Sequence, residues 1–517
     1  MMTPPLILVE IRPMVKLMLA RQWMWPMVRR LFESTCFLAG ICLAGQASAQ
    51  EVLIDADKRA FPPTLEGRKV HGEVAFGVRP GLLVEDPIVA LEPTFSLDFS
   101  DRIPLRFRLG APIRLRIVDR SPEQGTTLRR TDWDEAGDYL SILQSLTFAD
   151  AYAHGRGGYS VHASLDIIDG RSLGDGAIIN GYTNSLDLDR RRGGVDAGIR
   201  VHGPLLGAPA GIELELLVGD LTGQQVFAGR VAADWAGAWL GLTVAGDPFA
   251  PRTLTMGGGP DRLVVDRKNA IDVAERRGVT SLGLDIGYDI TDHWWYTIRP
   301  HLDLVLMPGL GRGLHLGTDA WFAVGRRRQV RLGGLGELTV GDDSYDPGYF
   351  DVFYTQQRAQ AQFVDVPSGL PGEFATTALP KAAFVAAESL GGVGGYGGLR
   401  FEHVDGAFAQ TGYRYRPGPL GHTWETRVGV ELPEVSLSLV HAHRGELGFA
   451  ILEPRGTLVQ LDLDVPVGAY FSINARLGYV YVTQRATGAT AATGLPSSGF
   501  VGGGGVVLVG VRGHLGF

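Results

Sequence analysis

The chain has 517 residues, a formal net charge of −8 and a mean hydropathy of +0.07. Acidic and basic residues are mixed along it, which argues against a nucleic-acid partner. Its 72 glycines, about double the average share, follow no G-x-y period, so a collagen-like helix is excluded. This glycine content is typical of a chain with many tight turns and closely approaching strands.

Residues 1–49 have the features of a secretory signal peptide. Arg29 and Arg30 supply a basic end, Cys36–Ala44 is a short apolar run, and Ala47-Ser48-Ala49 is a small-residue cleavage site. Met27 is an alternative start. Both cysteines of the chain precede residue 50, so the exported chain is expected to form no disulfide. Residues 50–71 are expected to form a short periplasmic segment.

Period-two alternation of apolar and polar residues recurs from residue 72 to the end, which predicts an all-β chain. In 105–117 the apolar residues stand at every odd position, and four arginines, Arg106, Arg108, Arg114 and Arg116, stand at even ones. No run of 18 apolar residues follows residue 50, so no spanning helix is expected. A chain that crosses a bilayer with strands must close its sheet, because lipid cannot satisfy open edges.

The pattern predicts a transmembrane antiparallel up-and-down β-barrel over 72–517, with 16–20 strands and a best count of 20. Long connections near 119–157, 247–279, 342–390 and 483–505 all join an odd strand to an even one, as outer loops of outer-membrane barrels do. The expected strands lie near 72–83, 89–99, 104–118, 158–167, 176–187, 193–202, 211–218, 225–233, 238–246, 280–290, 294–306, 313–324, 328–341, 391–404, 407–415, 423–432, 435–442, 456–465, 469–482 and 506–517.

Two of the long connections contain features of their own. Thr131–Phe148 begins with a Thr/Asp cap and has apolar residues at helical spacing, which predicts a short helix in the first outer loop. The aromatic-rich connection 342–390 predicts a packed extracellular cap. Within it, an acidic pair, a Tyr, then Tyr349-Phe350 and later Ser368-Gly369-Leu370-Pro371 resemble a local pattern of the MipA/OmpV family of outer-membrane proteins.

Candidate chemistry is sparse along the strands. His162 and Ser164 share the inward face of one strand and superficially resemble the Ser and His of outer-membrane lipid hydrolases, but residues two apart on a strand lie about 7 Å apart, too far for a direct nucleophile–base hydrogen bond. His441 and His443 share a face without a third ligand. We therefore expect no catalytic residues, no metal and no cofactor.

The arginines at 106–116 have two readings. They are either an electropositive stripe that attracts anionic solutes, or structural partners of lumen acids. The candidate acids are Asp98, Glu213, Glu215, Asp462 and Asp464.

The last strand alternates an apolar face, including Val509, Val511, Leu515 and the terminal Phe517, with a mixed one. It resembles the closing strand of Gram-negative outer-membrane β-barrels, whose terminal Phe is a signal for the assembly machinery. The resemblance implies export to the cell outer membrane, contact with its lipid and lipopolysaccharide, and periplasmic chaperones and the barrel-assembly machinery as partners during biogenesis. Association as a homo-trimer is left open.

Three functions remain to be separated. The leading expectation is a porin-like channel for passive passage of small solutes. The alternative is a closed barrel that acts structurally or through its long outer loops, and the remotest is an outer-membrane hydrolase using His162 and Ser164. A ring of small inward residues would favour the pore, whereas an inward-folded 342–390 connection would favour the closed barrel.

Overall fold

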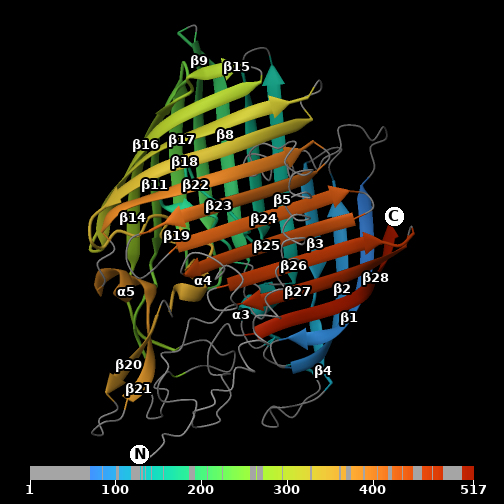
Figure 1. Cartoon of the computed structure of the whole chain (residues 1–517). Helices are drawn as coiled ribbons and strands as arrows, with labels where there is room; N and C mark the ends of the chain where they lie inside the picture. The colour runs from blue at the N-terminus through green and yellow to red at the C-terminus, as the bar shows by residue number, and fades with distance from the viewer. Residues whose placement is uncertain are drawn as a thin grey trace, which may run out of the picture.

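A computed structural model describes residues 70–516, apart from short stretches at several turns and longer ones at 118–127, 185–192, most of 257–271, 446–456 and 481–503. The described strands form one closed antiparallel sheet (Figure 1). The first strand, β1, pairs with both β2 and the last strand, β28, so that the sheet closes on itself. The predicted barrel and its best count of 20 strands are confirmed.

Two of the twenty barrel strands are built from two pieces each. β3 and β4 hold one register against β2 on either side of Pro112, whose missing N–H interrupts the ladder, and β14 and β15 both pair with β16. The barrel elements are β1 (His71–Leu83), β2 (Asp86–Asp98), β3 (Leu105–Gly110), β4 (Ile113–Arg116), β5 (Leu143–His154), β6 (Gly157–Asp166), β8 (Gly194–Leu205), β9 (Ala208–Val218), β10 (Phe227–Trp235), β11 (Ala238–Asp247), β14 (Val279–Tyr288), β15 (Thr291–His293), β16 (Tyr296–Met307), β17 (Gly311–Val324), β18 (Val330–Gly341), β22 (Gly392–His403), β23 (Ala407–Tyr415), β24 (His422–Leu432), β25 (Val435–Gly445), β26 (Thr457–Pro466), β27 (Phe471–Val480) and β28 (Gly504–Gly516).

The alternation places apolar side chains on the outside of the barrel. On β9, Ile212, Leu214 and Leu216 are 58%, 48% and 48% exposed, whereas Glu213 and Glu215 point inward. The same exposed apolar rows run along β1, β11, β14, β16 and β28. A continuous apolar outer face of this kind is stable only against lipid. Among the described residues, the helices are too short to cross a bilayer.

Two local predictions are wrong. The described part of the strand expected at 176–187, residues 176–184, is not a barrel strand, because positive-φ glycines, Gly176 and Gly181 among them, fold it into a compact loop. The connection expected at 119–157 is also too long, because β5 enters the barrel at Leu143. The short helix expected within Thr131–Phe148 is confirmed as α3 (Ala136–Leu140). Leu143 and Leu146, three residues apart in sequence, belong to β5, and a register shift between them places both on the same face of the strand, so their spacing imitates that of a helix.

The added strand and the missing strand cancel, so the count stays at 20 strands, but the bounds of the connections change. The first long connection runs from 117 to 142 rather than 119–157, and a further one, 167–193, joins β6 to β8. All the long connections still join an odd to an even barrel strand. In Figure 1 the described parts of several of them gather at the lower end, with α3, α5 (Lys381–Ala387), β20 (Gln362–Pro367) and β21 (Phe374–Leu379). This long-loop end is opposite an end of short turns.

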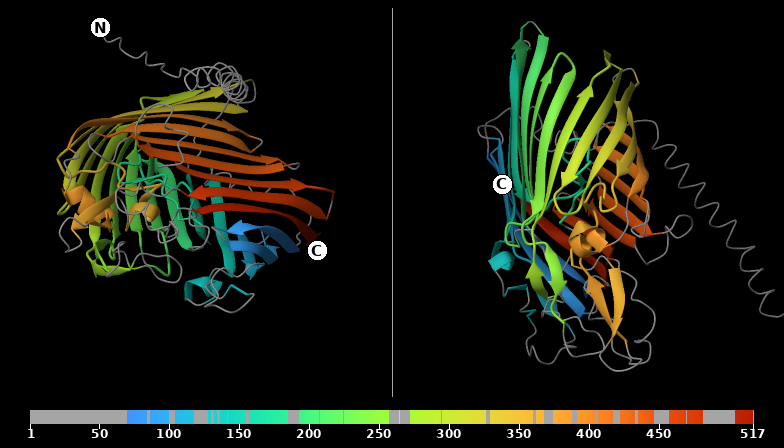
Figure 2. Two further views of the ribbon diagram at one scale, coloured as in Figure 1. Left: turned by 60° about the horizontal axis from the view of Figure 1, so that its bottom comes forward. Right: turned by 90° about the vertical axis from the view of Figure 1, so that its left-hand side faces the viewer.

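Small elements outside the barrel sheet lie in two of these connections. β12 (Pro251–Leu254) and β13 (Val273–Arg276) form a hairpin beyond β11. In the connection 342–391, β19 (Phe350–Asp351) and α4 (Tyr354–Gln357) turn into the barrel, where β19 pairs with Ile179–Asn180. The lumen is thus occupied by chain at the long-loop end. Figure 2 shows the barrel from two further sides, with the red C-terminal strand beside the blue N-terminal strands.

Candidate functional site

Two segments fold inward and meet inside the barrel. Inner loop 1 (residues 167–184) contains β7 (Ile179–Asn180), and inner loop 2 (residues 342–358) contains β19 and α4. They pair as parallel strands, Ile179 with Phe350, and the backbone N–H of Phe350 donates to the carbonyl oxygen of Ile178 at 3.2 Å. We call the two inner loops together the lumen plug.

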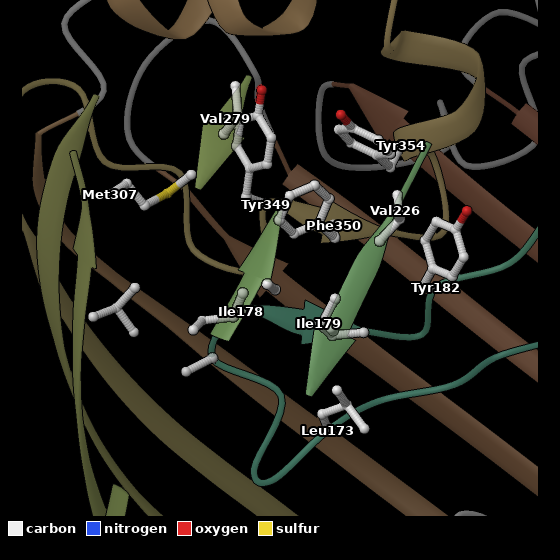
Figure 3. Packing of buried hydrophobic residues seen from close by; sticks show 14 of the residues in the cluster. Leu173, Ile178, Ile179, Tyr182, Val226, Val279, Met307, Tyr349, Phe350 and Tyr354 are labelled. Atoms are coloured by element: carbon white, nitrogen blue, oxygen red, sulfur yellow. The ribbon is translucent and has the colours of Figure 1, made fainter. Parts of the chain in front are cut away.

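The plug has a hydrophobic core that includes the barrel wall. Ile179, Tyr182 and Phe350 are fully buried, and Tyr349 and Tyr354 are 1% exposed. They pack against inward-facing wall residues on β10, β14 and β16 and on the turn before β10 (Figure 3). The labelled wall residues are Val226, Val279 and Met307. The inward face of the barrel is therefore zoned, apolar near the long-loop end and charged toward the short turns.

Buried ion pairs hold inner loop 2 to the wall. Asp351 accepts hydrogen bonds from Arg444 on β25 and from Arg416, which follows β23, at 3.2 Å. Lys381, the first residue of α5, lies 3.1 Å from Asp346 and donates to the carbonyl oxygen of Tyr349. We call Asp346, Asp351, Lys381, Arg416 and Arg444 the anchor cluster, and each is at most 7% exposed.

The charges of the anchor cluster compensate one another. Burial alone would raise the pKa of Asp351, but the cations of Arg444, Lys381 and Arg416 outweigh burial and hold its pKa below the usual range. Asp346 has a lowered pKa for the same reason, with Arg416 the largest of its cationic neighbours. Both carboxylates therefore stay ionised inside the barrel, where an unpaired charge would be strongly destabilising.

A second set of polar contacts holds the plug to other wall strands. Asp247, at the end of β11, accepts hydrogen bonds from Tyr354 at 2.8 Å and from the guanidinium of Arg358. Arg427 on β24 reaches Asp169 of inner loop 1, and Arg171 joins the same loop to Glu215 at 2.6 Å. The plug is thus tied to strands around much of the lumen.

Beneath the plug, on the side of the short turns, lies a cavity of about 640 Å³. Five arginines line it: Arg171, Arg200, Arg230, Arg299 and Arg400. Six acids face them, and two tryptophans, Trp239 and Trp321, complete the wall; the acids are Asp175, Glu213, Glu215, Asp234, Asp289 and Asp319.

The cavity charges differ in how fully they are compensated. Arg230 lies 2.7 Å from Asp285 and 3.6 Å from Glu215, whereas Arg400 lies over the ring of Trp321 at 5.5 Å. Burial raises the pKa of Asp175, in inner loop 1, to about 6, although His301 and Arg230 act in the opposite direction. The cavity therefore presents both a cation on an aromatic face and a carboxyl with weak compensation.

The arginines at 106–116 lie outside this cavity. Arg106 pairs with Asp98 at 3.0 Å and Arg114 with Asp132 at 3.1 Å. Arg108 is exposed and Arg116 is 7% exposed. The acids proposed as their partners mostly pair with other arginines, Asp462 with Arg476, Asp464 with Arg512 at 3.9 Å, and Glu213 with Arg230 at 3.9 Å.

The remaining predicted positions are placed as follows. Val509, Val511 and Leu515 are 48–61% exposed on the outer face of β28, and Phe517 lies outside the described residues. Ser164 Oγ donates to the carbonyl oxygen of Asp196 at 3.4 Å, and His162 Nε2 lies 3.7 Å from the Asp196 carboxylate. The two side chains are thus each directed at Asp196. The ring of His443 contacts Thr457 Oγ1 at 2.8 Å.

The plug, the anchor cluster and the cavity were not identified from the sequence. One signal for them is present: on β16 the inward positions change from His301 and Asp303 to Val305 and Met307 along a single face. A barrel strand whose inward residues turn apolar at one end indicates that chain, not water, covers that end.

No protein-family model matches the chain, and no curated protein is similar to it in sequence. Solved structures with related architecture include the ferric enterobactin receptor PfeA of Pseudomonas aeruginosa, at 10% identity and a TM-score of 0.37 over 87% of this chain and 82% of that one. The siderophore receptor PirA of the same organism has 8% identity and a TM-score of 0.31 over 87% and 81%. A mutant porin of Rh. blastica has 9% identity and a TM-score of 0.25 over 86% and 99%.

The class of the protein follows from its own geometry. Twenty antiparallel strands close into a barrel whose outer face is apolar and whose inner face is charged and partly filled by chain. A closed sheet with long loops at one end and short turns at the other is the architecture of Gram-negative outer-membrane proteins. The chain is a transmembrane β-barrel of the outer membrane.

Proposed function

We propose that this barrel is a selective channel for small charged solutes, narrowed by the lumen plug, rather than a wide diffusion pore. The observation that carries the proposal is the cavity of about 640 Å³ beneath the plug, lined by arginines and acids. Its size lies within the roughly 300–1,000 Å³ of typical small-molecule sites. A barrel of twenty strands could enclose an aqueous channel, and here the described chain restricts it at the long-loop end.

With five arginines and six acids, the lining favours a solute that carries charges of both signs. Arg200 and Arg299 are 42% and 36% exposed at their side chains and pair with Asp234 and Asp289 in partly hydrated positions. Such pairs are individually weak, so a solute carboxylate or phosphate can exchange with the protein carboxylate. Arg400 over Trp321 offers a further cation together with an apolar surface.

A second candidate function, the permanently closed barrel with a structural or surface role, is favoured by the inward fold of residues 342–358, which is the outcome expected of a closed barrel. The hydrophobic core shared by the plug and the wall contains residues with 0–2% exposure, and such packing resembles a domain interior more than a mobile gate. The two proposals differ in one measurable respect: a channel must pass solutes under conditions in which the anchor cluster is intact.

Bilayer recordings separate them. The chain is expressed with its own export segment in a Gram-negative host, purified from the outer membrane and inserted into a planar bilayer. Stepwise conductance supports the channel, and Arg400→Gln should shift the bias between anions and cations toward cations. The matched control is Arg106→Gln, which removes an arginine outside the cavity. A silent bilayer with folded protein contradicts the channel and favours the closed barrel, whereas a shift found only in Arg106→Gln would move the selective site to the arginines at 106–116.

A further inference from the structure

Three side chains of metal-ligating type meet where the plug contacts the wall. They are Asp175 of inner loop 1 and His301 and Asp303 of β16, and one ligand atom from each lies within 4.8 Å of the other two. His301 and Asp303 are 3% and 2% exposed. Asp175 lines the cavity, so an ion can reach this group of residues from there.

The backbone accounts for the meeting. His301 and Asp303 are two residues apart on one strand, so their side chains point to the same face. About 7 Å separates the Cα atoms of such neighbours along the strand, and the side chains converge so that their ligand atoms lie within 4.8 Å of each other. Asp175 lies between Gly174 and Gly176, whose φ values of +56° and +85° turn the tip of inner loop 1 toward the wall.

The polar atoms of this group lack partners. Both ring nitrogens of His301, both carboxylate oxygens of Asp303 and one oxygen of Asp175 are buried without a hydrogen bond from any described residue. Buried polar groups are almost always satisfied, and a buried carboxylate without a cation is strongly destabilising. Three groups left unsatisfied around one point indicate a missing shared partner.

The charged neighbours are committed elsewhere. In the sheet register Asp303 lies between Asp285 on β14 and His315 on β17. Asp285 pairs with Arg230 at 2.7 Å. His315 contacts Glu337 at 2.9 Å and the hydroxyl of Tyr345 at 2.5 Å. Among the described residues, the charged neighbours therefore form pairs of their own and leave Asp175 and Asp303 without a dedicated cation.

We propose that Asp175, His301 and Asp303 bind one divalent transition-metal ion that joins the lumen plug to the barrel wall. Two carboxylates and one imidazole are a donor set for Zn²⁺ or a similar first-row ion, since imidazole is a poor ligand for Ca²⁺ or Mg²⁺. Side-chain rotation can bring the three atoms to the ~2.0–2.2 Å that Zn²⁺ prefers, with water in the remaining position. The site is independent of whether the barrel conducts.

The test measures Zn²⁺ binding to the full chain purified from the outer membrane, after removal of metal with a chelator. We expect the metal-free protein to take up one Zn²⁺ per chain, measured by elemental analysis. His301→Gln and Asp303→Asn should each weaken binding at least about 100-fold, because even changes outside the ligand set typically cost about 10–100-fold. His162→Gln is the matched control, since His162 also lies beside one aspartate, Asp196, on a barrel strand, and it should bind Zn²⁺ as the wild type does.

Unfolding temperatures with and without Zn²⁺ test whether the metal joins the lumen plug to the barrel wall, and they exclude misfolding of the variants. Zn²⁺ should raise the unfolding temperature of the wild type and of His162→Gln, but not of Asp175→Asn, which keeps both wall ligands. Without metal, Asp303→Asn should unfold near the temperature of the wild type, because asparagine replaces a buried carboxyl that has no hydrogen-bond partner among the described residues to lose. Absence of stoichiometric Zn²⁺ from the wild type, or equal binding by all variants, would overturn the proposal, as would a metal-induced rise that persists in Asp175→Asn.

Discussion

Neutralising Asp351 should release the lumen plug. Its carboxylate contacts Arg444, Arg416 and Lys381, and it is 5% exposed. Removing one partner from a buried ion pair costs about 3–5 kcal/mol. Because asparagine keeps one hydrogen-bond acceptor, we take the lower end, about 3 kcal/mol for Asp351→Asn. At about 1.4 kcal/mol per tenfold change in an equilibrium, the undocked fraction of inner loop 2 should rise about 100-fold.

The assay is single-channel recording, with the frequency and duration of high-conductance events as the measured quantities. Asp342→Asn is the matched control in the same loop. The ion-pair partner of Asp342 is Arg312, which lies 3.7 Å away and has a side chain that is 80% exposed. Such a surface pair contributes about 0–1 kcal/mol, so the control should change the open fraction at most about fivefold. A folded Asp351→Asn barrel with the wild-type event frequency would refute the reasoning that the anchor cluster holds the plug.

Three further predictions concern pH, the outer face and the barrel seam. The pKa values of Asp346 and Asp351 are lowered in the folded barrel, so their contribution is fully present above the unfolded value of about 3.9 and is lost only as the pH falls through the lower folded values. The frequency of plug release should therefore be constant between pH ~8 and ~5, whereas the charge of the cavity changes as Asp175 titrates at about pH 6; plug release at pH ~6 would contradict this. Leu214→Arg, on the lipid face of β9, should reduce the free energy of unfolding in lipid by about 2–4 kcal/mol, measured by urea titration. Glu213→Gln, on the inward face, should change this free energy much less, and equal effects of the two substitutions would argue against the assigned faces. Gly510→Ala should lower the yield of heat-resistant barrel, because a Cβ there would meet the carbonyl oxygen of Val78 at the β1–β28 seam; Gly516→Ala, whose nearest neighbour is 3.9 Å away, is the control, and equal yields would contradict a tight seam.

The barrel was predictable because lipid imposes a periodic rule on every strand. The alternation of Ile212, Leu214 and Leu216 with Glu213 and Glu215 is visible in the sequence, and the structure places the two sets on opposite faces. The rule that long connections join an odd strand to the next even strand was also predictable. Adding β5 and removing the strand expected at 176–187 left the numbering of the later strands unchanged.

The contents of the lumen were not predictable in the same way. Inner loop 1 has enough apolar residues to resemble a strand, and only the positive-φ glycines within it distinguish the two outcomes. The partners of Asp351 come from β23, β25 and α5, which are separated by dozens of residues, so no local pattern brings them together. His301 and Asp303 are adjacent on one face in the sequence, but the third ligand, Asp175, arrives through the fold of a loop more than 100 residues earlier.

The most direct test of the account is the single-channel conductance of the wild-type barrel compared with a variant whose inner loop 2 is shortened. We predict small, stepwise conductance for the wild type, and a several-fold larger, less selective conductance once residues 345–357 are replaced by a short Gly/Ser linker. Equal conductance in the two proteins, with folding verified by heat-modifiable gel mobility, would contradict the claim that the plug restricts a conducting lumen.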